Sequence, residues 1–187
     1  ELSGPLTEQQ REQLDRIQRS QQHLLGVIND ILNFSRMEAG QVAYEVEPVA
    51  LHEVTEAVTP MVELQARTEG IELVIRPCAP TLTALADRAK VEQILINLLT
   101  NATKFTPSGG EIELACGGDS GYVWVSVRDN GIGIPEDHLE SIFAPFVQVG
   151  RTLSTPKEGT GLGLAISRDL ARAMNGDLTV KSKVDAG

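Results

Sequence analysis

Residues 159–166 read GTGLGLAI, and this stretch decides how the second half of the chain is interpreted. Three glycines at alternate positions come directly before Leu164, Ala165 and Ile166, so backbone without side chains leads into a predicted helix. The spacing fits neither the G-x-G-x-x-G of dinucleotide-binding folds nor the Gly-Lys-Ser/Thr ending of the Walker loop. Backbone N–H groups at a helix N-terminus attract phosphate groups. The stretch therefore predicts a phosphate-binding loop of another kind.

The segment that leads into this loop, residues 147–160, is rich in Gly, Ser, Thr and Pro. A loop of that length without secondary structure is often a lid over a ligand. Just before it, Phe143 and Phe146 stand three residues apart, and we expect a small core cluster there rather than a ligand box. The lid and the glycines together predict a bound triphosphate.

The chain has 187 residues and a formal net charge of −10, which argues against nucleic acid or an anionic membrane as a partner. No apolar run reaches the length of a membrane span, and the first residues do not resemble a signal peptide. We therefore expect a cytoplasmic segment without direct membrane contact, whether or not the parent protein is anchored elsewhere. Cys78 and Cys116 lie on different predicted elements, and we expect buried free thiols in a reducing compartment.

Residues 7–38 form one long predicted helix with apolar positions three and four residues apart and a polar outer face. The apolar stripe consists of Leu14, Ile17, Leu24, Leu25, Ile28, Ile31 and Leu32. Gly40 follows as a left-handed cap. Because a lone helix of this kind is marginal in water, we expect a partner helix or a second subunit on the stripe.

After Gly40 the hydrophobic period changes from helical to alternating. Three segments alternate apolar and polar residues and are predicted strands, at 71–76, 111–116 and 122–128, with a hairpin connection at 117–121. Helices are predicted at 51–67, 87–103 and 161–174, although Pro60 weakens the first of them. The expected fold class is α+β. It is a two-layer α/β sandwich with a mixed, largely antiparallel sheet, covered by helices on one face and preceded by the long amphipathic helix.

The helix that begins after the candidate N-cap Asp87 carries a polar row. Asn97, Asn101 and Lys104 fall at i, i+4 and i+7, at the edge of its buried arc. Amide oxygens can hold a hard cation, and an ammonium group can meet a phosphate oxygen. The alternative is that these side chains are only solvated or capping groups.

The stretch DNGIGIP, residues 129–135, follows directly on a predicted strand. Asp129 offers a fixed carboxylate acceptor that can take the exocyclic amine of adenine, and Gly131 and Gly133 let a flat ring approach the backbone. A simple Asp-Asn-Gly turn explains the same residues equally well.

Four motifs in this order resemble the N box, first glycine box, F box and second glycine box of sensor histidine kinases. They read NLLTNATKFTP, DNGIGIP, IFAPFVQ and GTGLGLAI. The resemblance implies that residues 1–40 are part of the dimerisation and phosphoacceptor hairpin, namely its second helix. It also implies that residues 41–187 are an ATP-binding catalytic domain of the GHKL (Bergerat) fold, without the last strand that the family usually has.

The same resemblance implies a role for each motif residue. Asn101 would be the Mg²⁺ ligand with Asn97 assisting, and Lys104 would contact phosphate. The remaining nucleotide contacts would come from the ring of Phe105, from the base-binding residues Asp129, Gly131, Gly133 and Ile134, and from the phosphate-binding residues Thr160, Gly161, Leu162, Gly163 and Leu164.

The phosphoacceptor motif of the family, His-Glu-x-Arg-x-Pro, is absent from the sequence. His52 imitates it in part, but it follows the long helix and lacks the Arg, so we interpret it as an ordinary helix-start residue. His23 and His138 are expected to serve packing or the surface. The resemblance thus implies a domain that positions Mg-ATP for transfer to a histidine on a helix outside this chain, and then to an aspartate of a response regulator.

Two other functions stay open at this point. One is a pseudokinase or signalling scaffold that acts through helix-mediated dimerisation and partner docking. The other is an ATP hydrolase of the same superfamily, which Asn97 disfavours because hydrolysing relatives carry a Glu there as base.

Overall fold

The computed structural model describes residues 7–40, 42–119, 121–148 and 160–187. Its first element is the long helix α1, Glu8–Glu38. Thr7 caps it, because the Thr7 side chain accepts the Gln10 N–H while the Gln10 side chain accepts the Thr7 N–H. Gly40 follows with a φ of +63°. Both ends of the predicted helix are thereby confirmed.

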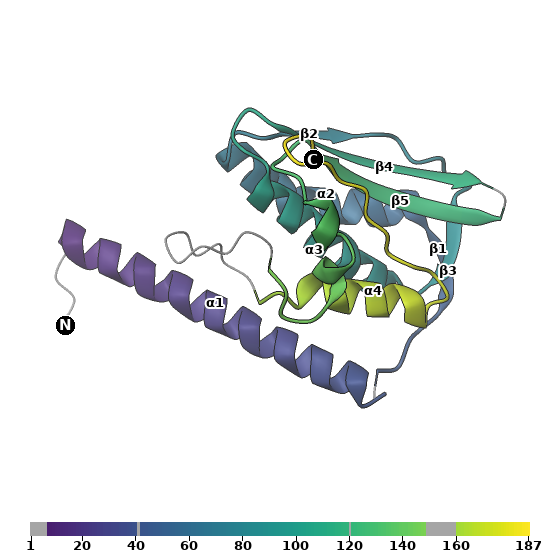
Figure 1. Cartoon of the computed structure of the whole chain (residues 1–187), viewed down its shortest axis with the longest axis horizontal. Coiled ribbons are helices and arrows are strands. Elements are labelled where there is room, and N and C mark those ends of the chain that lie inside the picture. Colours follow the sequence, from purple (N-terminus) through teal and green to yellow (C-terminus); the bar gives the residue numbers. More distant parts are fainter. Residues whose placement is uncertain (1–6, 41, 120, 149–159) are drawn as a thin grey trace.

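Above α1 in Figure 1 lies the two-layer α/β sandwich that the sequence predicts. The helical layer is α2, Leu51–Thr68, α3, Arg88–Phe105, and α4, Gly163–Ala173. The main sheet has the order β2-β4-β5, with β2 parallel to β4 and β4 antiparallel to β5. Its strands are β2, Glu72–Ile75, β4, Glu111–Asp119, and β5, Tyr122–Asp129. The α+β class and the mixed sheet are confirmed.

Two short strands form a separate antiparallel pair that the sequence did not predict: β1, Glu47–Ala50, and β3, Thr83–Ala86. Two short 3₁₀ helices, η1, Glu136–His138, and η2, Ser141–Phe143, lie between β5 and α4. The helix α2 continues through Pro60 without a break.

The main core lies between the sheet and the helices α2 and α3. Its largest fully buried side chains are Val54, Val58, Leu99, Ile112 and Leu114. Along β5, inward and outward residues alternate as predicted, so the sheet buries one face only. The helices therefore cover the apolar face of the sheet.

A second apolar cluster joins α4 to α1. Ile94, Leu162, Ile166 and Leu170 are buried in it, and Phe34 and Met37 of α1 pack against it. In Figure 1 α1 passes along α4 on the side away from the sheet. The apolar stripe of α1 stays exposed along its whole length in the single chain, from Leu14 to Leu32.

The expectation of two free thiols is wrong, because Cys78 and Cys116 form a disulfide with a Cα–Cα distance of 5.5 Å. The parallel pairing of β2 with β4 sets Ile75 beside Leu114. Cys78 follows the end of β2, and Cys116 lies two residues further along β4, so the register brings the two side chains together. The pairing links segments that are 38 residues apart in sequence.

Candidate functional site

The helix α3 carries the polar row that the sequence predicts, and the row faces the start of α4. The Asn97 amide nitrogen donates to the Ser167 hydroxyl at 2.9 Å, and the Asn101 amide nitrogen lies 3.5 Å from the Asn97 Oδ1 atom. Ser167 is 2% exposed. The two amides are thus oriented by each other and by α4, which a merely solvated row would not require.

The first residue of α4 lies directly against Asn97. A Cβ atom added to Gly163 would overlap the Asn97 Oδ1 atom and would lie 3.0 Å from its Cγ. The side chain of Leu162 does not cap the helix, and Leu162 itself is fully buried. The helix α4 therefore begins beside the amides of α3, and a helix N-terminus is the environment that phosphate oxygens favour.

The loop before α4 is braced by the F-box segment. The Phe146 N–H donates to the Gly161 carbonyl at 2.9 Å. Gly161 has a φ of +73°, and a Cβ there would lie 2.8 Å from the Phe146 carbonyl carbon. A residue with a side chain would be strained at this position and would collide with the neighbouring chain. The Thr160 hydroxyl accepts the Leu162 N–H at 3.2 Å.

The loop after β5 packs against the other end of α3. The Asp129 carboxylate accepts the Gly131 N–H at 2.9 Å, and the Ile132 N–H donates to the Phe105 carbonyl at 3.3 Å. Since a carboxylate has about four acceptor sites, this bond leaves Asp129 with capacity for a ligand amine. Lys104 lies beside the same end, with its Nζ atom 5.1 Å from the centre of the Phe105 ring.

The C-terminal residues cover the outer side of that loop. The Ile134 N–H donates to the Ser182 hydroxyl at 2.8 Å, and the Asp185 N–H donates to the Ile132 carbonyl at 2.9 Å. Gly133 lies against the backbone of Lys183. The loop is therefore held from both sides, by α3 and by the C-terminal segment.

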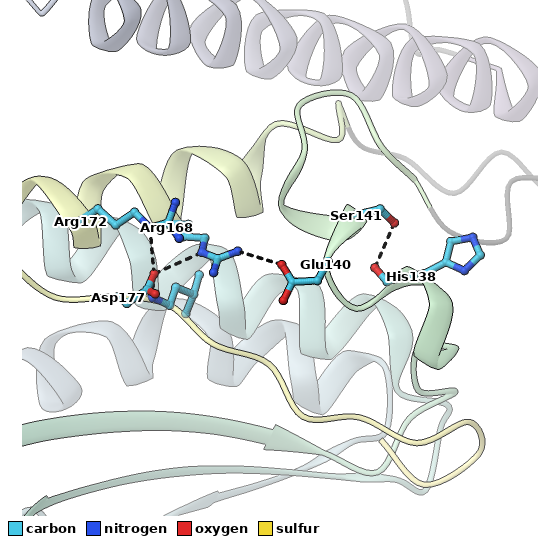
Figure 2. A network of polar contacts seen from close by, with 7 residues as sticks. His138, Glu140, Ser141, Arg168, Arg172 and Asp177 are labelled. Atoms are coloured by element: carbon cyan, nitrogen blue, oxygen red, sulfur yellow. Dashed lines mark hydrogen bonds and ion pairs between the residues drawn. The ribbon is translucent and has the colours of Figure 1, made fainter.

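Arg168 of α4 holds η2 in place (Figure 2). Its guanidinium lies 4.3 Å from the centre of the Phe143 ring, 3.2 Å from Asp177 and 3.8 Å from Glu140. The Leu178 N–H and the Arg168 side chain lower the pKa of Asp177. The expected core cluster of Phe143 and Phe146 is wrong, because Phe143 packs under Arg168 while Phe146 is 64% exposed.

The structure brings the predicted residues together along α3. Its middle meets Gly161, Leu162, Gly163 and the start of α4, and its end meets the loop from Asp129 to Ile134. No role for Ser167 or Arg168 was predicted from the sequence. Ser167 stands one helical turn after Gly163 on the buried face of α4, and a polar residue on that face was the signal that could have indicated it. Most of the predicted lid, residues 149–159, lies outside the described residues.

The structure describes the side chains of two of the three histidines, His52 and His138. His52 is the second residue of α2, and His138 is half-exposed in η1 with Nδ1 2.8 Å from Asp137. The described part of the chain holds no group of three His, Cys, Asp or Glu residues that could bind a metal ion. A cation in this site would therefore depend on amide oxygens and on the phosphates of its ligand.

Comparison with known proteins identifies the family. Residues 86–187 match the family described as "Histidine kinase-, DNA gyrase B-, and HSP90-like ATPase", which covers more than half of the chain. Residues 1–40 match the "His Kinase A (phospho-acceptor) domain". The chain belongs to the histidine kinase family. It contains the catalytic ATPase domain of a histidine kinase of a two-component system, preceded by a phosphoacceptor-domain segment.

Similar histidine kinases align along nearly the whole chain. The autoinducer 2 sensor kinase/phosphatase LuxQ of Vibrio parahaemolyticus is 36% identical over 186 residues, which are 96% of this chain and 22% of LuxQ. The histidine protein kinase DivJ of Caulobacter vibrioides is 34% identical over 188 residues, which are 100% of this chain and 31% of DivJ. The chain thus spans less than a third of the length of these two relatives.

Solved histidine kinase structures have the same fold. Full-length ShkA in complex with AMPPNP matches with a TM-score of 0.81 and 34% identity, over 98% of this chain and 38% of ShkA. ThkA in complex with the response regulator TrrA matches with a TM-score of 0.70 and 26% identity, over 94% of this chain and 47% of that chain.

Proposed function

We propose that this domain binds ATP with Mg²⁺ and positions the γ-phosphoryl group for transfer to a histidine on a helix outside this chain. The observation that carries the proposal is the contact of Asn97 with α4. Through it, the polar row of α3 and the glycine-rich start of α4 form one surface, with the Asp129 loop at the end of the same helix. The ShkA complex with AMPPNP supports a nucleotide on this fold.

The adenine ring would bind at the loop after β5. The free acceptor sites of Asp129 suit the exocyclic amine, while Gly131, Gly133 and Ile134 and the ring of Phe105 would line the base. The triphosphate would then extend along α3 toward α4. The N–H groups of the residues from Gly161 to Leu164 and the Lys104 ammonium would donate to its oxygens.

The residues present fit Mg²⁺ as a cofactor bound largely through the nucleotide. Mg²⁺ usually keeps several waters and takes one or two protein oxygens plus substrate phosphates. Asn101 would supply that protein oxygen, and Asn97 would orient it, since its own amide is engaged with Ser167. When bound, the ion neutralises phosphate charge, a contribution that matters in a chain with a net charge of −10.

A kinase fits the site better than a hydrolase. The position beside the phosphates is held by the amide of Asn97, which cannot take a proton from water. The domain would therefore contribute positioning and charge stabilisation and leave the nucleophile to the acceptor histidine.

The partners would be a second subunit and a response regulator. The exposed α1 stripe suits dimerisation through the helical hairpin, and the complex of ThkA with TrrA supports a receiver domain as phosphoryl acceptor. None of the described helices is long and apolar enough to span a bilayer. We expect the segment to act in the cytoplasm, where it meets ATP.

Isothermal titration with AMPPNP and Mg²⁺ would test the adenine assignment through Asp129→Ala. A hydrogen bond to a charged group contributes about 1.5–3 kcal/mol, so we expect affinity to fall by about ten- to a hundredfold. Glu136→Ala, an exposed acid seven residues further on, is the matched control and should keep the parent affinity. Equal affinities of all three proteins would refute the adenine site.

A further inference from the structure

A side chain of α1 reaches the loop that precedes α4. The Thr160 hydroxyl donates to the Asp30 Oδ2 atom at 2.7 Å, across 130 residues of sequence. The same hydroxyl oxygen accepts the Leu162 N–H at 3.2 Å. Asp30 and Thr160 are both partly buried. One hydroxyl group therefore links the α1 carboxylate to a backbone N–H of the proposed phosphate-binding loop.

A second contact of α1 reaches the same loop from the F-box side. Phe34 stands one turn after Asp30, on the same face of α1. Its ring packs edge to face on Phe146, with the ring centres 6.4 Å apart. Since the Phe146 N–H also donates to the Gly161 carbonyl, α1 touches both chain segments that form the loop. Asp30 and Phe34 of α1 thus contact Thr160 and Phe146, which are hydrogen-bonded to Leu162 and Gly161.

A bound phosphate would compete with Asp30 and Thr160 for the hydrogen-bond donors of this contact. A threonine hydroxyl has a single proton, and here Asp30 accepts it. A phosphate oxygen that accepts the Leu162 N–H or the Thr160 O–H would break one of these two bonds. The Asp30 carboxylate would in addition repel the phosphate across the intervening hydroxyl.

We propose that Asp30 is a positioning residue that couples the docking of α1 to occupancy of the phosphate site with opposite sign. While α1 is docked, Thr160 and Leu162 are engaged with each other and with Asp30, and the triphosphate binds more weakly. A bound triphosphate in turn loosens the contact of α1 with α4, because coupling between two binding events is reciprocal. The inference rests on the proposed nucleotide site.

Asp30→Ala tests the coupling, because it removes the carboxylate and leaves a residue that favours the helix. Calorimetry with Mg-AMPPNP and, separately, with adenosine compares the variant with the parent. We expect AMPPNP to bind about fivefold tighter, at the lower end of typical coupling, and adenosine to bind unchanged because it has no phosphate. Glu12→Ala removes the same charge from α1 about 27 Å along the helix, and should change neither affinity.

Hydrogen exchange gives the reciprocal measurement on the parent chain. Saturating AMPPNP should speed amide exchange in residues 27–38 of α1, whereas saturating adenosine should not. Unchanged AMPPNP affinity in Asp30→Ala, or an equal change for adenosine, would overturn the coupling. Failure of the parent chain to bind AMPPNP at all would refute the proposed function, and the coupling with it.

Discussion

Gly163→Ala should destabilise the domain, although alanine is the better helix former. Gly163 is the first residue of α4 and has a helical backbone, so an added side chain meets no conformational barrier. The new Cβ atom would overlap the Asn97 amide oxygen. That amide cannot simply rotate away, because its nitrogen donates to the buried Ser167 hydroxyl.

The magnitude follows from two opposing effects. Inserting a methyl group into a filled contact costs about 1–3 kcal/mol, and replacing glycine by alanine in a helix gains at most about 1 kcal/mol. The net change is a loss of about 1 kcal/mol in the free energy of unfolding, or a fall in Tm of about 2–4 °C for a chain of this size. Gly26→Ala is the matched control, because no atom lies within 4 Å of its added Cβ in α1.

Thermal unfolding followed by far-UV circular dichroism would measure both variants beside the parent. Gly26→Ala should raise stability by about 0.5–1 kcal/mol, while Gly163→Ala lowers it. Combining Gly163→Ala with Asn97→Ala should abolish the penalty of the glycine replacement, because the overlapping amide is then gone. If Gly163→Ala were as stabilising as Gly26→Ala, the contact of α3 with the start of α4 would be refuted.

Two further predictions concern the supporting structure. Reduction of the disulfide between Cys78 and Cys116 should lower the free energy of unfolding by up to about 4 kcal/mol, the loop-closure value for a separation of 38 residues. Denaturant unfolding with and without dithiothreitol measures this loss, and an unchanged midpoint would mean that the thiols are free. The bonds from the Leu178 N–H and the Arg168 side chain lower the pKa of Asp177 in the folded protein. The carboxylate therefore contributes to the free energy of unfolding above its ordinary pKa of 3.8, and this contribution is lost as the pH falls through its lower pKa in the folded state. Asp177→Asn should therefore be less stable than the parent at pH 7, and a stability gap that persisted undiminished at pH 2 would contradict this role.

The sequence predicted those features that depend on local pattern. The helical period predicted α1, and strict alternation predicted β4 and β5, because each of these periodicities extends over six residues or more. The connection between the strands is shorter than the predicted 117–121, since β4 continues to Asp119. The i, i+4, i+7 spacing put Asn97, Asn101 and Lys104 on one edge of α3. In the structure the Asn97 amide reaches Ser167 of α4, and the Asn101 amide lies against Asn97. The family resemblance then predicted ligand roles for residues whose spacing alone indicates none.

Features that depend on distant pairing could not be predicted. The strands β1 and β3 have four residues each, too few for a periodic signal, and they are stabilised by pairing with each other. The disulfide follows from the register of β2 on β4, and the contact of Asp30 with Thr160 joins residues at opposite ends of the chain. Such contacts arise only when the elements are packed in three dimensions.

The most direct test of the account is the Mg²⁺ dependence of AMPPNP binding to the parent chain and to Asn101→Ala. In the parent, Mg²⁺ should increase the affinity for AMPPNP about tenfold or more, because one additional interaction of about 1.4 kcal/mol changes the dissociation constant tenfold. Asn101→Ala should bind the metal-free nucleotide as the parent does and lose the gain from Mg²⁺, while Asn29→Ala on α1 keeps it. Binding by a folded parent chain that Mg²⁺ does not strengthen, or a full Mg²⁺ effect in Asn101→Ala, would contradict the assignment of the polar row of α3 to Mg-ATP.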